Sequence, residues 1–257
     1  MTDCDSESVL DAVRRDGASA GLLNGDGGGD RGTPVSTERS VQCLEAACDR
    51  GLSEDEMLAQ WAEAGAFDSF EALDAVLAGI LPGGLFKSFS GRRRRLRDGA
   101  RMVLKQSSSV PAVKLGIAVL GAAGDRTDVP LLEELALHPQ LCHYGVTALA
   151  NLGMSNRAGT GALLRLLHKT ASAERVIVID RLLWFVKEPA VRFALVRDGL
   201  RGMEPDDARE VADAIYDSCR VEQGMDDEAA SPEVREGCAL ILRHRRPADE
   251  ADEAAEL

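Results

Sequence analysis

Two histidines and a cysteine lie close together in this sequence, and all three are residue types that bind transition metals. His138 and Cys142 are four residues apart, so one face of a helix would carry both, and His143 follows directly. Zinc needs three or four protein ligands, and no further ligand is evident nearby. Pro139 also interrupts the approach to the helix. We therefore interpret these residues as structural and expect no metal and no cofactor.

The other residue types that perform catalysis show no catalytic arrangement. His168 and His244 lie alone near predicted helix ends, where a partial positive charge is favourable. No serine or cysteine occupies a nucleophile elbow, and no glycine-rich fingerprint lies between a strand and a helix. Carboxylate pairs on predicted helix starts and in loops favour capping and solvation; they are Glu133/Glu134, Asp206/Asp207 and Asp226/Asp227. We expect no catalytic residue, which favours a protein that is not an enzyme.

A basic cluster is the strongest local feature of the chain. The 257 residues contain 30 Lys+Arg against 43 Asp+Glu, a formal net charge of −13, which argues against a protein that mainly coats nucleic acid. Two interpretations of the cluster stay open: it binds an anionic protein face, phospholipid headgroup or nucleic-acid backbone, or its arginines pair with acidic side chains on neighbouring helices. The cluster comprises Arg92, Arg93, Arg94, Arg95, Arg97 and Arg101.

Trp184 is a second candidate for partner binding. The residues three and four positions away from it are all charged: Asp180, Arg181, Lys187 and Glu188. The apolar stripe of the same helix consists instead of Ile179, Leu182, Leu183 and Val186. This pattern predicts that Trp184 lies on the outer side, where a large aromatic side chain anchors a partner. The alternative is that Trp184 packs against the next helical unit.

Apolar residues recur with helical spacing from Ser36 onward, and no alternating run is long enough for a sheet, so the sequence predicts an all-α fold. We expect a largely disordered N-terminus over 1–35, with a possible short helix at Ser6–Arg15 before a glycine-rich linker. A helical extension follows over 36–108, and residues 247–257 form an acidic disordered tail. The expected helices of the extension are Thr37–Arg50, one opened by a Ser53/Glu56 capping box, one opened by Asp68 and Glu71, and one from about Ser90 to Gln106. The apolar side predicted for the last of these helices is Leu96, Ala100, Val103 and Leu104.

An internal repeat covers the middle of the chain. GIAVLGAAG at 116–124 matches GVTALANLG at 145–153, and each precedes a leucine-rich segment, 131–137 or 163–169. Two helices per unit and a period near thirty are typical of an α-solenoid. A divergent third copy follows, and the apolar stripe of its second helix is predicted to be Val191, Ala194 and Leu195. Two amphipathic helices then follow at 204–220 and 231–243, and the apolar side predicted for the latter is Val234, Cys238, Ile241 and Leu242. We expect small residues to permit close helix packing, prolines to occupy first turns, and Asp128 and Glu204 to cap exposed amides.

The segments GIAVLGAAGDRTDVPLLEELA and GVTALANLGMSNRAGTGALLRLL resemble HEAT-like repeats, as found in relatives of the phycobilin lyases and in armadillo-type folds. The resemblance implies a short right-handed α-solenoid over 109–246. It also implies a non-enzymatic scaffold or regulatory protein that binds a protein partner through its concave face. Two alternatives are a bilin-lyase-like protein that handles a chromophore and a HEAT-like nucleic-acid-binding repair protein. Scarce aromatic residues argue against the first, and a basic cluster that precedes the repeats argues against the second.

The sequence also predicts a cellular compartment. The first residues lack a basic leader and an apolar run, and no apolar stretch approaches the ~20 residues that a transmembrane helix needs. The six cysteines are scattered without a CxxC pair, which is typical of reduced thiols. We therefore expect a cytoplasmic protein.

Overall fold

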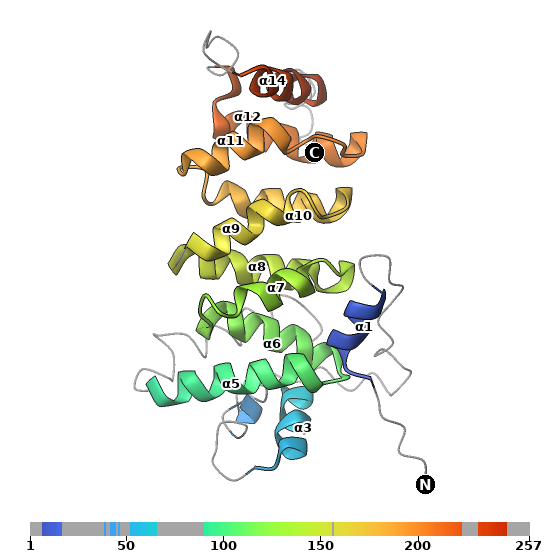
Figure 1. The fold of residues 1–257 in the computed structure, drawn as a ribbon, viewed down its shortest axis with the longest axis vertical. Coiled ribbons are helices and arrows are strands. Elements are labelled where there is room, and N and C mark those ends of the chain that lie inside the picture. The colour runs from blue at the N-terminus through green and yellow to red at the C-terminus, as the bar shows by residue number, and fades with distance from the viewer. Residues whose placement is uncertain are drawn as a thin grey trace, which may run out of the picture. The chain divides into compact units, whose positions relative to one another are not determined.

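The described part of the chain is all-helical. A computed structural model describes residues 7–16, 39, 42–44, 46, 52–65, 90–155, 157–222 and 231–245. Within these ranges every regular element is a helix, so the predicted all-α class is confirmed, and the helices pack in neighbouring pairs (Figure 1). The chain divides into two compact units, Met1–Gly159 and Thr160–Leu257.

The first unit is built around a series of paired helices. Helix α5 (Ser90–Gln106) packs against α6 (Val110–Ala123), and α8 (Pro139–Ser155) packs against both α6 and α7 (Val129–Ala136). Helix α1 (Val9–Asp16) lies on α5, and α3 (Glu54–Ala64) packs against α6 and α5. The helix predicted from about Ser90 to Gln106 is confirmed as α5, and its predicted apolar side is buried: Leu96, Ala100, Val103 and Leu104.

The second unit contains the C-terminal helices. Helix α9 (Arg157–Leu166) spans the division between the units and is followed by α10 (Ser172–Leu183), α11 (Pro189–Asp198), α12 (Pro205–Cys219) and α14 (Pro232–His244). Helix α10 packs against α11 and α12, and α14 packs against the same two helices. The two predicted terminal helices are confirmed as α12 and α14. Leu242 was predicted on the apolar side of α14 but is 40% exposed, whereas Cys238 and Ile241 of the same side are buried.

Glycines allow close helix packing in the first unit, as predicted. A Cβ placed on Gly121 of α6 would lie 2.7 Å from the Cα of Ala148 on α8. A Cβ on Gly145 of α8 would lie 2.7 Å from the Cβ of Ala136 on α7. Side chains do not tolerate such distances, so any larger residue would force these helices apart. The two matched repeat segments lie on α6 and α8.

Local sequence marks the starts of several helices. The Ser53 hydroxyl accepts a hydrogen bond from the Glu56 amide, and the Glu56 carboxylate accepts one from the Ser53 amide, so the predicted capping box forms. Pro130 and Pro205 occupy the first turns of α7 and α12, as predicted.

The caps predicted for Asp128 and Glu204 do not form. Neither side chain accepts a hydrogen bond from an amide of the helix that it precedes. The Asp128 carboxylate instead accepts from the guanidinium of Arg101 and from the Asp125 amide. Glu204 carries a longer side chain than the Ser, Thr, Asp and Asn that suit this position.

Several predictions concern residues outside the described ranges. They include the helix opened by Asp68 and Glu71, the glycine-rich segment and the acidic tail. Of the helix predicted at Thr37–Arg50, residues 39, 42–44 and 46 are described, and they are helical. The short helix predicted at Ser6–Arg15 is observed as α1, which begins at Val9.

Candidate functional site

The predicted arginine cluster lies on α5, and its members differ in exposure. Arg93, Arg94 and Arg95 are exposed, whereas the side chains of Arg97 and Arg101 are 25% and 28% exposed. Arg97 and Arg101 are four residues apart and so share one face of the helix. The backbone of residue 92 belongs to α5, and the side chain of Arg92 lies outside the described residues.

Arg97 and Arg101 bind the turn between α6 and α7. Arg101 donates from Nε to Asp128 Oδ1 at 2.5 Å and from Nη2 to the Thr127 hydroxyl at 2.8 Å. Arg97 donates from Nη1 to Asp125 Oδ2 at 2.6 Å. The Asp128 side chain is only 3% exposed, so Arg101 neutralises a carboxylate that water barely reaches.

Hydrogen bonds within the turn hold these carboxylates in place. The Asp125 amide donates to Asp128 Oδ2 at 2.8 Å, and Thr127 donates from its hydroxyl and its amide to Asp125 Oδ1 at 2.6 and 2.9 Å. The two Thr127 bonds lower the pKa of Asp125, and the charges of Arg97 and Arg101 add to this effect. Arg97 and Arg101 are therefore paired within the chain, in line with one of the two interpretations of the cluster.

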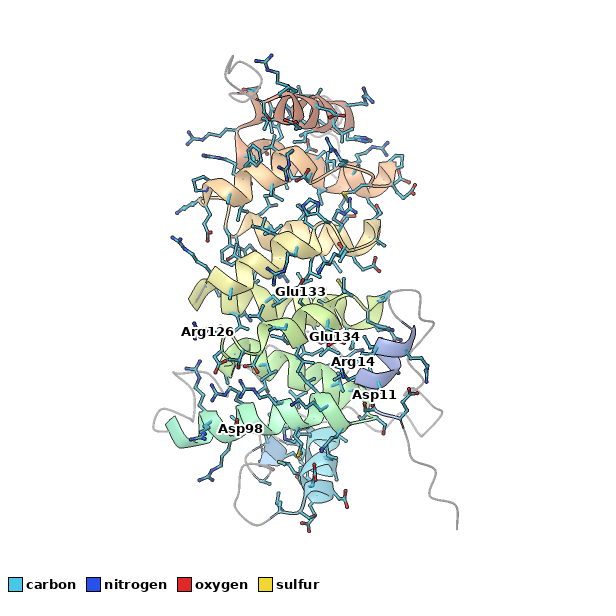
Figure 2. The ribbon with its side chains drawn as sticks, in the orientation of Figure 1. Asp11, Arg14, Asp98, Arg126, Glu133 and Glu134 are labelled. Carbon is cyan, nitrogen blue, oxygen red and sulfur yellow. The ribbon has the colours of Figure 1, made fainter. Side chains whose placement is uncertain are left out.

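Arg93 and Arg94 make weaker contacts than Arg97 and Arg101 do. Arg93 donates from Nη2 to the carbonyl of Ala122 at 3.2 Å. The Nε of Arg94 lies 3.7 Å from Asp98 Oδ2, and both side chains are exposed; Asp98 is labelled on α5 in Figure 2. Exposed ion pairs of this kind contribute little to stability. Arg93, Arg94 and Arg95 thus keep positive charge at the surface, and binding of an anionic partner stays a prediction for them.

Trp184 lies at the C-terminal end of α10 and is 51% exposed, as the sequence pattern predicted. The guanidinium of Arg181 lies over its indole, 4.6 Å from the ring centroid. On the next helix, α11, Phe193 is 45% exposed and the guanidinium of Arg197 lies 5.0 Å from its ring centroid. A guanidinium over an aromatic ring is attracted by the ring's π electrons, and this attraction restrains the ring.

Sequence reasoning missed Phe193. Val191, Ala194 and Leu195 form the predicted apolar stripe of α11, and all three are buried. Phe193 falls outside this stripe, just as Trp184 falls outside the stripe of α10. An aromatic residue outside the apolar stripe is the sequence signal that could have identified Phe193 as exposed.

The histidines lie on or beside helices α8, α9 and α14. His138 and Cys142 are buried and His143 is half-buried. Among the residues that the structure describes, no three His, Cys, Asp or Glu side chains are placed to hold a metal ion. His168 follows α9 with its Nε2 3.7 Å from Asp198 Oδ2, and His244 ends α14.

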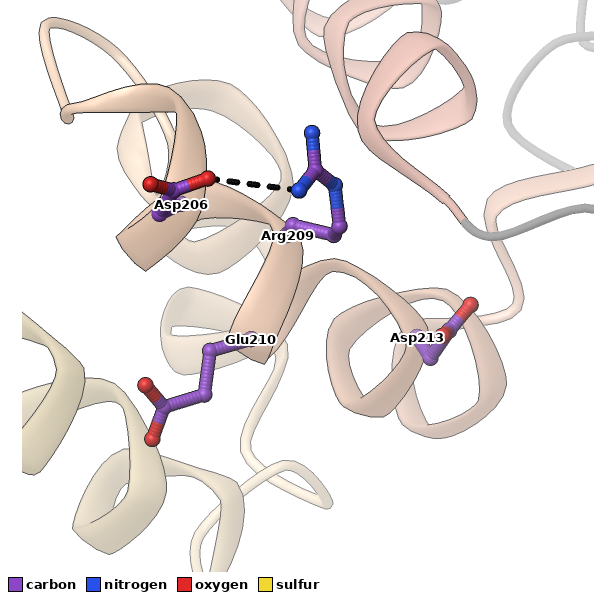
Figure 3. Close-up of a pocket in the computed structure, with 4 residues that line it drawn as sticks. All are labelled: Asp206, Arg209, Glu210 and Asp213. Carbon is purple, nitrogen blue, oxygen red and sulfur yellow. Dashed lines mark hydrogen bonds and ion pairs between the residues drawn. The ribbon is translucent and has the colours of Figure 1, made fainter. Parts of the chain in front are cut away.

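An acidic hollow of about 430 Å³ lies on α12 (Figure 3). Its lining residues are Asp206, Arg209, Glu210 and Asp213, whose spacing places them on one face of a single helix. Arg209 donates to Asp206 at 3.2 Å, and Asp213 accepts from Arg245 at 3.1 Å. Ligand pockets normally enclose converging groups from several elements. The described residues that line this hollow all belong to α12, and we assign no chemistry to it.

Three comparisons bear on the family of this chain. Family models, curated proteins and solved structures were compared with it, and none gave a significant match. The resemblance to HEAT-like repeats therefore depends on the sequence pattern alone. None of the described helices combines the length and the apolar character that crossing a bilayer requires.

Proposed function

We propose that this protein is a non-enzymatic scaffold or regulatory protein that binds a protein partner. The observation that carries the proposal is the exposure of Trp184 and Phe193 on α10 and α11, each stacked by an arginine. Binding hot spots are enriched in tryptophan and arginine, and aromatic residues are enriched in interfaces generally. A ring already restrained by a guanidinium loses little conformational freedom when a partner covers it.

We further propose that the helix pairs are HEAT-like repeats of a short right-handed α-solenoid. In each unit, helices that are two apart in the chain contact each other: α6 packs against α8, and α10 packs against α12. This arrangement is expected when each two-helix repeat buries its apolar side against its neighbour. The matched segments 116–124 and 145–153 lie on α6 and α8, which supports the assignment of repeats. Repeat proteins of this type commonly bind protein partners along their concave surface.

We also propose a cytoplasmic location. The structure describes four cysteines, Cys43, Cys142, Cys219 and Cys238; all four are buried, and none of these four forms a disulfide bond. Burial raises the pKa of Cys219 to about 11, so its thiol is protonated and unreactive at neutral pH. Free thiols in a chain of this size are typical of a reducing compartment.

Substitution of both exposed rings tests the binding function. We would capture partners from the host extract with the wild-type chain, with Trp184→Ala/Phe193→Ala, and with Leu242→Ala as a control. Leu242 is also an exposed apolar side chain of the second unit. Each captured protein would then be purified and titrated against the three chains.

We expect at least one purified partner to bind the double variant about 30-fold more weakly, the loss typical of hot-spot residues, and to bind the Leu242→Ala chain as it binds wild type. Circular dichroism is expected to be unchanged, because both rings lie at the surface. Wild-type affinity of the double variant for every captured protein would refute the proposed binding surface.

A further inference from the structure

Helix α1 lies on the first unit through one apolar side. Val9, Leu10 and Val13 are buried, and α1 packs against α5. The Val9 amide donates a hydrogen bond of 2.9 Å to the carbonyl of Ser107, just after the end of α5. The apolar side therefore covers a surface that α5 would otherwise expose to water.

A bidentate ion pair at the surface joins α1 to α7. Arg14 donates from Nε to Oε1 of Glu134 at 2.7 Å and from Nη2 to Oε2 at 3.2 Å. Figure 2 shows these two side chains between α1 and α7. Two parallel hydrogen bonds match the planar guanidinium, so Glu134 specifies an arginine at this position.

Helix α1 depends on docking for its helical structure. It has eight residues, and isolated helices shorter than about 12–15 residues are marginal in water. The Ser8 hydroxyl accepts from the Asp11 amide at 3.2 Å and caps the start of the helix, but one cap does not offset the cost of nucleation. Folding and docking of α1 are therefore one event, and the helix is lost when it leaves the surface.

The sequence after α1 has the composition of a tether. Residues 17–38 include seven glycines, which is typical of linkers. A tethered ligand acts at an effective concentration in roughly the millimolar range, which suffices to keep a weakly binding helix docked. A helix from another protein with the same pattern and a higher intrinsic affinity would displace it.

We propose that the surface beneath α1 is a docking site for an amphipathic helix of a protein partner, and that α1 occupies this site until the partner displaces it. The matching helix carries two adjacent apolar residues, a third apolar residue three positions later and an arginine immediately after it. These positions correspond to Val9, Leu10, Val13 and Arg14. The site lies in the first unit and is independent of Trp184 and Phe193.

The test uses the full chain carrying Leu10→Asp, which removes an apolar contact of α1 and leaves Glu134 unchanged. The probe is a synthetic peptide of residues 6–16, added up to roughly millimolar concentration, while amide NMR signals of α5 and α7 are followed. We expect the peptide to shift these signals in the Leu10→Asp chain. In the wild-type chain we expect binding to be at least about tenfold weaker, because α1 already fills the site.

Charge reversal tests the role of Glu134. In the Leu10→Asp chain, Glu134→Arg is expected to weaken binding of the peptide at least about tenfold. A peptide that carries Arg14→Glu is expected to restore it. Arg126→Glu is the matched control, because Arg126 is an exposed charge in the turn before α7, and we expect it to leave binding unchanged.

Two outcomes of the titration would overturn the proposal. In the first, the Leu10→Asp chain stays helical but its α5 and α7 signals do not respond to the peptide. In the second, two copies of the chain exchange α1 and form a dimer. Hydrogen exchange on the wild-type chain is a second measurement that needs no folded variant. We expect α1 amides to exchange faster than those of α6 and α8, and equal protection would also overturn the proposal.

Discussion

At the scale of single residues, arginines of one short stretch make different contributions. Arg101 reaches a carboxylate that is almost fully buried, whereas Arg94 faces an exposed one. Desolvation decides this difference, because a charge removed from water needs its partner and a hydrated charge does not. The number of arginines in the cluster therefore says little about what each of them does.

Removal of Arg101 is expected to destabilise the fold. Arg101→Ala leaves the Asp128 carboxylate without its guanidinium, and we expect the free energy of unfolding to fall by about 2 kcal/mol. Arg94→Ala is the control, with an expected change below about 0.5 kcal/mol. Urea denaturation followed by circular dichroism measures both changes. Equal losses in the two variants would show that the buried pair has no special role.

The Asp125 turn is expected to weaken in acid. Its Thr127 hydrogen bonds and the nearby arginines hold the pKa of Asp125 below the ordinary value, so the folded state favours the charged carboxylate. This stabilisation is fully present above about pH 4, the ordinary range for aspartate, and is lost as the pH falls through the lower folded value. We expect the Tm of the wild-type chain to exceed that of Asp125→Asn at neutral pH and the difference to shrink in acid. A difference that does not vary with pH would contradict this explanation.

At the scale of helices, local chemistry made much of the fold predictable. The apolar spacing predicted α5, and the Ser53/Glu56 pair predicted the start of α3. These signals are local, because a cap and its amide lie within one turn of each other. The Asp128 cap failed for the opposite reason: its partner, Arg101, lies 27 residues earlier in the chain.

The contacts of the candidate site were less predictable than the helices, because they join residues that are far apart in the sequence or depend on how side chains pack. Helical spacing placed Trp184 on the outer side, but it did not indicate that Arg181 lies over the ring. Nor did the sequence distinguish Arg97 and Arg101 from their neighbours, since their acidic partners lie in a distant turn. Side-chain partners across helices depend on packing, which periodicity alone does not specify.

Two glycines of the helices are expected to respond oppositely to the same substitution. Gly121→Ala brings a methyl group against the backbone of Ala148, and we expect a loss of about 1–3 kcal/mol. Gly161 lies within α9, and the nearest atom to a Cβ there is 3.7 Å away at the end of the Arg165 side chain. Gly161→Ala is therefore expected to stabilise the chain by up to about 1 kcal/mol through helix propensity. Thermal unfolding measures both, and a loss at both positions would refute the close-packing argument.

At the scale of the whole molecule, the two compact units each contain one of the two tryptophans. Trp61 is buried in the first unit, and Trp184 is exposed in the second. Trp184→Phe leaves Trp61 as the sole indole, and we expect its emission to be blue-shifted and poorly quenched by acrylamide compared with wild type, because water and quencher do not reach a buried ring. Unchanged quenching in the variant would contradict the burial of Trp61.

The contacts between α5 and the α6–α7 turn have a practical consequence for shortening the gene. A truncated product that starts at residue 109, the predicted start of the repeats, would retain Asp125 and Asp128 but lose both arginines that bind them. It would also expose the side of α6 that α5 covers. Newly exposed apolar surface of this kind causes aggregation. Expression plasmids that keep α5 joined to α6 are expected to yield soluble material, and those that begin at residue 109 are expected to yield inclusion bodies.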